Sequence, residues 1–148
     1  MILRMDAFDA DVIIYAAARG HLLGRRVRAL FPAGPTSETA AIAGVGSVLL
    51  LPEVLAKPMR EGASGEVAEL GALLGRLTLL PVDLATAELA TALAASYGLR
   101  ATDATHLATA IGAGADRFLT NNRKDFPPDM ITEIDVVYPS DLPEPAGQ

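Results

Sequence analysis

Short apolar runs alternate along this chain with longer amphipathic segments. Residues 44–51 form an apolar run with no polar alternation, which predicts a strand covered on both faces of its sheet. Near the C-terminus, Ile134, Val136 and Tyr138 show the two-residue period of a strand over 132–138. Further strands are expected at residues 4–8, 77–82 and 117–120.

Helical patterns occupy the segments between these strands. Gly98 is the expected end of a helix over 86–97, because glycine commonly terminates helices. Thr102 is expected to cap a helix over 102–113. Pro52 is expected to begin the helix that follows the strand at 44–51, since proline suits the first helical position. The remaining helices are expected at residues 11–18, 21–31, 36–43 and 64–76.

The alternation of strands and helices predicts an α/β layered fold with a mainly parallel sheet. A chain of 148 residues, of which 51% are hydrophobic, suits one domain with a sizeable core. We expect this domain to span residues 1–138. Residues 139–148 are rich in proline and acidic residues and are expected to be a flexible tail.

Composition excludes several classes of site. The chain has no cysteine, so disulfides, thiolate zinc sites and cysteine nucleophiles are excluded. No apolar stretch reaches the ~18 residues of a membrane helix, and the N-terminus lacks the pattern of a signal peptide, so a cytoplasmic protein without membrane contact is expected. The net charge of −6 argues against a general nucleic-acid coat, although metal-binding carboxylates would themselves lower the pI.

Acidic and amide side chains follow the predicted strands, at the point where each strand ends. In an open parallel sheet, the carboxyl ends of the strands lie at one edge, where ligands bind. Side chains that are far apart in sequence can therefore converge there. The residues concerned are Asp9, Asp11, Glu53, Asn121, Asn122 and Asp125, together with Asp103 at the start of a helix.

Converging carboxylates repel one another and stay ionised only when a cation neutralises them. Magnesium and manganese ions accept such an all-oxygen shell and retain bound waters. A metal held in this way can activate water and bind phosphate oxygens. Ligand type and charge thus predict a metal-assisted enzyme that acts on phosphoryl groups, without identifying its substrate.

Four stretches of the sequence resemble motifs of the PIN-domain family, and in particular its VapC-like toxin ribonucleases. The stretch 103–110 is close to the family's Asp-Ala-x-His-Leu-Ala-x-Ala helix. The segments 114–122 and 124–126 are similar to the family's closing motif, in which a strand leads to Thr, Asn and Asp residues. The runs 8–15 and 51–55 resemble the motifs that supply an aspartate after the first strand and a glutamate at a helix start.

This resemblance spans roughly residues 4–138, with the motifs in the family's order. It implies a three-layer α/β/α fold whose central, mainly parallel sheet is flanked by helices. It also implies an endoribonuclease that needs Mg²⁺ or Mn²⁺ and hydrolyses RNA phosphodiesters. Such an enzyme is the toxin of a type II toxin–antitoxin pair. It usually forms a homodimer, and a cognate antitoxin protein inhibits it.

The resemblance also implies which residues form the site. Asp9, Glu53 and Asp103 occupy the family's acidic metal positions. The fourth position usually reads Thr-x-Asp, whereas this sequence has Asn122 there. The side-chain carbonyl of Asn122 can still serve as a ligand, and Asp125 lies close enough in sequence to contribute.

Other interpretations stay open for the same residues. Asp9, Glu53 and Asp103 also suit the beginnings of helices, where acidic side chains cap or complement the helix dipole. The Asp-Ala-Asp-Val sequence at 9–12 also fits the nucleophile motif of haloacid-dehalogenase-like phosphatases, although the chain is short for that fold. A third alternative is a catalytically weakened PIN-like module that binds RNA or protein, which Asn122 and the acidic pI favour.

Three further features are assigned simpler roles. His106 lies one turn beyond Asp103 and is expected to pack and to form hydrogen bonds rather than act as a base. Asp116 precedes its strand, and at ~3.3 Å per residue it should lie about 13 Å from the carboxyl edge, outside the site. The basic cluster on the second helix is expected to be a solvated face, or else to contact RNA phosphate or an acidic antitoxin segment. It consists of Arg25, Arg26 and Arg28.

Overall fold

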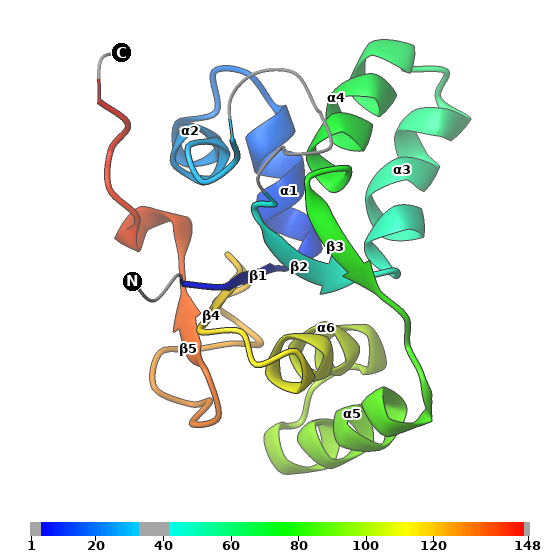
Figure 1. Ribbon diagram of the computed structural model, residues 1–148, viewed down its shortest axis with the longest axis vertical. Coiled ribbons are helices and arrows are strands. Elements are labelled where there is room, and N and C mark those ends of the chain that lie inside the picture. Colours follow the sequence, from blue (N-terminus) through cyan, green and yellow to red (C-terminus); the bar gives the residue numbers. More distant parts are fainter. Residues whose placement is uncertain (1–3, 33–41, 147–148) are drawn as a thin grey trace.

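The computed structural model describes residues 4–32 and 42–146. Five strands form one sheet in the order β3-β2-β1-β4-β5, and every neighbouring pair is parallel (Figure 1). Every predicted strand is present, although each is shorter than expected. The strands are β1 (Asp6–Phe8), β2 (Gly44–Ser47), β3 (Leu77–Leu80), β4 (Arg117–Leu119) and β5 (Asp135–Val137).

Helices cover both faces of the sheet, which gives the expected three-layer α/β/α arrangement (Figure 1). One layer contains α1 (Ala10–Ala17), α2 (Leu22–Arg28), α3 (Leu50–Arg60) and α4 (Ser64–Leu74). The other layer contains α5 (Leu84–Tyr97) and α6 (Ala101–Gly112). Within the described residues, no helix is long and apolar enough to cross a membrane.

The central strands supply side chains to two separate hydrophobic cores, because successive residues of a strand point to opposite faces. Ala7 and Phe118 pack in the core beneath α5 and α6. Phe8 and Leu119, the next residues along the same strands, pack in the core beneath α1–α4. The adjacent apolar residues that end β1 and β4 therefore reflect a sheet that is buried on both sides.

Several predicted helix boundaries differ from those of the structure. Helix α3 begins at Leu50 rather than at Pro52, and the predicted strand over 44–51 ends at Ser47. The hydroxyl of Ser47 accepts a hydrogen bond from the backbone N–H of Leu49 at 3.1 Å, which stabilises a turn at this point. Helix α6 begins at Ala101, so Thr102 lies inside it and is not its N-cap.

Helix α5 begins at Leu84, two residues before the predicted start. Its N-cap is Asp83, whose carboxylate accepts a hydrogen bond from the backbone N–H of Thr86 at 2.9 Å. The predicted helix over 36–43 falls mostly outside the described residues. Its last two positions, Ile42 and Ala43, are described and are not helical.

The segment after β5 packs against α2. Residues Pro139–Asp141 form a short 3-10 helix, and Leu142 is buried in the core beneath α1–α4. The Arg26 guanidinium donates hydrogen bonds to the backbone oxygens of Ser140 and Leu142 at 3.0 and 2.9 Å. The beginning of the predicted flexible tail is therefore part of the packed domain, and Arg26 is not simply a solvated residue of the basic cluster.

A close contact between the backbones of β1 and β2 explains why residue 44 is a glycine. A Cβ atom on Gly44 would lie 2.1 Å from the backbone oxygen of Asp6 and 2.9 Å from the Phe8 ring. We expect Gly44→Ala to force β1 and β2 apart and to lower the free energy of unfolding by roughly 1–3 kcal/mol, measured by urea denaturation.

Gly71→Ala in α4 is the matched control, because nothing lies within 4 Å of the Cβ it would add. This variant should raise stability by about 0.5–1 kcal/mol, the difference in helix propensity between glycine and alanine. Equal stability of Gly44→Ala and the wild-type protein would contradict the tight contact.

Candidate functional site

The expected acidic residues meet at the carboxyl edge of the sheet. Asp9 follows β1, Asn122 follows β4, Glu53 lies in the first turn of α3, and Asp103 lies in the first turn of α6. These four side chains line one open cavity. The other residues lining it are Ala10, Asp11 and Ile14.

Asp9 lies at the base of this cavity and is held rigidly. It is 5% exposed and caps α1, where its carboxylate accepts a hydrogen bond from the backbone N–H of Ala10 at 2.8 Å. Its second oxygen accepts a hydrogen bond from the Thr120 hydroxyl, also at 2.8 Å. Burial raises the pKa of Asp9, although its hydrogen bonds and nearby His106 oppose this rise. Asp9 therefore acts as a helix cap and as part of the carboxylate cluster at once.

Asp11 contributes a second buried acid to the same cavity. One of its oxygens accepts a hydrogen bond from the backbone N–H of Asn121 at 3.0 Å. The other oxygen is buried and has no hydrogen-bond partner among the described residues. Burial, followed by the charge of Asp9, raises the pKa of Asp11 to about 7. This carboxyl group thus has one buried acceptor oxygen that is unused among the described residues.

Asp103 and Asp125 extend the acidic region beyond the first cavity. Burial, followed by the charges of Asp9 and Asp125, raises the pKa of Asp103 to about 6. Asp125 lines an adjoining cavity together with Glu53, Asp103 and Asn122. Of the described residues that line either cavity, Arg100 is the only basic one, and its guanidinium lies 3.9 Å from the Asp125 carboxylate.

Asn122 and Asp125 are joined by two hydrogen bonds. The Asn122 amide donates to the Asp125 carboxylate at 2.8 Å, and its carbonyl accepts from the Asp125 backbone N–H at 3.2 Å. The position at which the family's pattern has an acid therefore carries an amide bonded to an acid three residues later. The negative charge at this corner of the site comes from Asp125.

Glu53 is held by a buried histidine. His106 is 2% exposed, and its Nε2 atom forms a hydrogen bond with the Glu53 carboxylate. Burial alone would lower the pKa of His106, but the bond to Glu53 and the charge of Asp9 outweigh this effect and raise the pKa. The expectation that His106 packs and forms hydrogen bonds is confirmed.

One contribution, that of Thr120, was missed by the sequence reasoning. Thr120 is fully buried, donates to Asp9 and accepts a hydrogen bond from the Asn122 backbone N–H at 3.1 Å, so it connects two walls of the site. Its place between a strand and two asparagines was the available signal. Asp11, which was expected among the converging side chains, lines the cavity.

Asp116 lies outside the site, as predicted. Its carboxylate accepts a hydrogen bond from the Met5 backbone N–H at 2.7 Å, at the amino end of β4. Beside it, the Arg117 guanidinium forms two hydrogen bonds with Asp6, at 2.8 and 3.0 Å. The acids at this opposite edge are therefore used to tie β1 to β4.

The donor set matches a hard divalent cation in its chemistry. All the candidate ligands are oxygens, three carboxyl groups have raised pKa values, and one Asp11 oxygen is buried without a donor. In the described part of the chain, no three acidic or histidine side chains stand close enough to hold one ion as they are placed. Binding an ion would therefore require these side chains to move closer together.

Comparison with known proteins supports this description. A model of the PIN domain family matches residues 7–127. Among solved structures, a toxin–antitoxin complex from Klebsiella pneumoniae is similar to this chain. The match covers 88% of this chain and 98% of the other chain, with 22% sequence identity and a TM-score of 0.62. VapBC2 from Rickettsia felis, bound to a DNA fragment from its promoter, is also similar. This match covers 90% of this chain and 98% of the other chain, with 15% sequence identity and a TM-score of 0.63. No curated protein matches the sequence significantly.

The raised pKa of Asp11 gives a testable pH dependence. A carboxyl group with a pKa of about 7 in the folded protein, against 3.8 ordinarily, costs stability as pH rises through this interval. Asp11→Asn removes this cost and keeps a carbonyl acceptor for Asn121. In EDTA at about pH 8, this variant should be more stable than wild type by on the order of 1–2 kcal/mol.

Urea denaturation at several pH values measures this effect. The difference between Asp11→Asn and wild type should shrink as pH falls toward about 4, where the carboxyl group is protonated in both states. Asp135→Asn, at an exposed position of β5, is the control and should show no such trend. A constant difference at all pH values would argue against a charged, buried Asp11.

Proposed function

This chain belongs to the PIN domain family, and from that premise we propose that it is a Mg²⁺- or Mn²⁺-dependent endoribonuclease, the toxin of a type II toxin–antitoxin pair. Proteins of this family are nucleases. The observation that carries the proposal is the meeting of Asp9, Glu53 and Asp103 in one cavity, from three separate elements of the fold. Among the described residues, no single partner could neutralise the charges of all three carboxylates.

In this proposal, Asp9, Glu53 and Asp103 hold the metal ion, and Asn122 with Asp125 completes the site. When bound, the ion supplies an activated water and neutralises charge on the phosphate. The protein's own task is positioning. The Ala10 N–H and the Thr120 hydroxyl fix Asp9, while the Arg100 side chain at the rim offers a cation for an RNA phosphate.

The proposed partners are RNA as substrate, a cognate antitoxin protein, and a second copy of this chain in a homodimer. Both similar structures contain a toxin with its antitoxin, which supports an antitoxin for this chain too. The fold and the family match favour this interpretation over a haloacid-dehalogenase-like phosphatase. Both oxygens of Asp9, the nucleophile in that alternative, already accept hydrogen bonds.

We expect Asp9→Asn and Asp103→Asn each to reduce Mn²⁺-dependent RNA cleavage at least about 100-fold, because each removes a charge that holds the ion. Cleavage is measured on a mixed RNA substrate, with folding checked by circular dichroism. Asp135→Asn, at the opposite edge of the sheet, should retain full activity. Undiminished cleavage by well-folded Asp9→Asn and Asp103→Asn would refute the proposal.

A second prediction concerns the positioning of Glu53. His106→Ala removes the partner that holds this carboxylate and should weaken Mn²⁺ binding about 10-fold, the usual effect of losing a group that orients a ligand. Isothermal titration calorimetry with Mn²⁺ measures the change. Thr105→Ala, whose hydroxyl bonds only to the backbone of its own helix, serves as the control. If wild-type protein binds no Mn²⁺ at millimolar concentration, the weakened module is favoured instead.

A further inference from the structure

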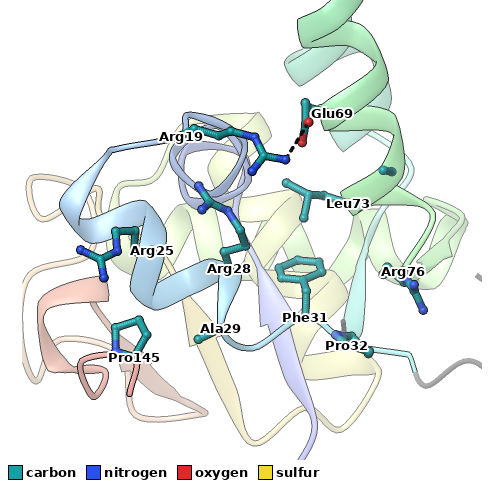
Figure 2. A pocket seen from close by; sticks show the side chains of 11 residues that line it. Arg19, Arg25, Arg28, Ala29, Phe31, Pro32, Glu69, Leu73, Arg76 and Pro145 are labelled. Atoms are coloured by element: carbon teal, nitrogen blue, oxygen red, sulfur yellow. Dashed lines mark hydrogen bonds and ion pairs between the residues drawn. The ribbon is translucent and has the colours of Figure 1, made fainter. Parts of the chain in front are cut away.

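A further cavity, of about 600 Å³, is lined by residues of α2, α4 and the segments next to them (Figure 2). Arg19 lies just after α1, at the end of that helix away from Asp9, and Arg76 lies just before β3. The cavity is therefore at the amino edge of the sheet, between α2 and α4. None of its lining residues lines either of the two acidic cavities.

Positive charge is concentrated in this cavity. Among the described residues, four of the chain's 12 basic residues line it, against one acidic residue, in a protein of net charge −6. The basic residues are Arg19, Arg25, Arg28 and Arg76, and the acidic residue is Glu69. A concave surface that keeps a net positive charge in an acidic protein indicates a site for an anion.

Two of these arginines, Arg28 and Arg19, are held without a strong acidic partner among the described residues. The Arg28 side chain donates to the backbone oxygens of Ala16 at 2.7 Å and of Ala18 at 3.4 Å, and neither acceptor carries a charge. Arg19 and Glu69 pair at 3.1 Å, but their side chains are 77% and 47% exposed, so this pair is weak and easily exchanged. A phosphate group could replace the Glu69 carboxylate as the partner of Arg19.

An apolar wall lies beside the arginines. In Figure 2 the ring of Phe31 and the side chain of Leu73 lie between Arg28 and Arg76. The Phe31 ring packs against Phe8 with 5.2 Å between ring centroids, which fixes its orientation. An aromatic ring next to guanidinium groups offers stacking for a base and hydrogen bonds for a phosphate. The cavity's volume is that of a small-molecule site.

We propose that this arginine cavity binds a phosphorylated nucleotide, with the phosphates on Arg19, Arg25 and Arg28 and the base against Phe31. The nucleotide can be a free nucleoside polyphosphate or one unit of an RNA strand, since both present the same chemistry. The RNA source rests on the proposed nuclease function, whereas the free nucleotide does not. In either case the site is separate from the carboxylate cluster.

The test measures binding by the full chain in EDTA, so that no metal-dependent cleavage takes place. The probes are ATP, a short single-stranded RNA, inorganic phosphate and polyglutamate. We expect saturable binding of ATP or of the RNA that weakens with added salt. Saturation by ATP assigns the site to free nucleotides, and binding of the RNA alone assigns it to an RNA strand.

Variants then locate the binding. The double variant Arg19→Gln/Arg25→Gln should lose at least about 10-fold in affinity, because two charge-assisted hydrogen bonds are removed. Arg60→Gln, at an exposed position of α3 outside the cavity, should bind as wild type does. Phe31→Leu should weaken ATP or RNA binding while leaving phosphate binding unchanged. Thermal unfolding verifies that each variant is folded.

Three results would overturn the proposal. They are no binding of ATP or RNA, unchanged binding by the double variant, and equal binding of polyglutamate, which would indicate a site for an acidic protein segment. The same titration on Asp103→Asn distinguishes a failure of this proposal from a failure of the proposed nuclease function. This variant should bind the nucleotide normally even if the protein proves to have no nuclease activity.

Discussion

Burial of several carboxyl groups at one edge of the sheet is the constraint that the rest of this structure has to satisfy. Asp9 is fixed there by a backbone N–H and by Thr120, and Asp11 and Asp103 lie in the same cavity with raised pKa values. Without a cation, this arrangement costs free energy, because each charge is poorly solvated and repelled by the next. The cluster persists because the surrounding elements are held together by other interactions.

Those interactions come from a sheet that is covered on both faces. The alternation of Ala7 with Phe8 on β1, and of Phe118 with Leu119 on β4, anchors the two central strands in two hydrophobic cores. Asp9 and Thr120 directly follow these strands, so the packing of the cores fixes their positions. Hydrophobic burial in the layers thus offsets the electrostatic cost at the edge.

The sequence was informative where a single residue's chemistry decides the local structure, and less so where packing decides it. Gly98 ends α5 with a left-handed backbone, as expected from glycine's freedom. Pro52 and Thr102 suggested helix starts that the structure does not use, because a turn at Ser47 and a start at Ala101 come first. The meeting of Asp9, Glu53, Asp103 and Asn122 could be predicted from the topology of a parallel sheet. The bonds of Asn122 to Asp125 could not, since they depend on the shape of one loop.

The central place of β1 has a consequence for how the chain is made. This strand is synthesised before the other four strands of the sheet, yet one of its two neighbours is β4, whose residues lie 111 positions later along the chain. One edge of β1 therefore stays unpaired until those later residues have been synthesised. An open strand edge next to apolar side chains is prone to aggregation. Until β4 has been made, the nascent protein should thus depend on chaperones, or on slow and well-timed translation.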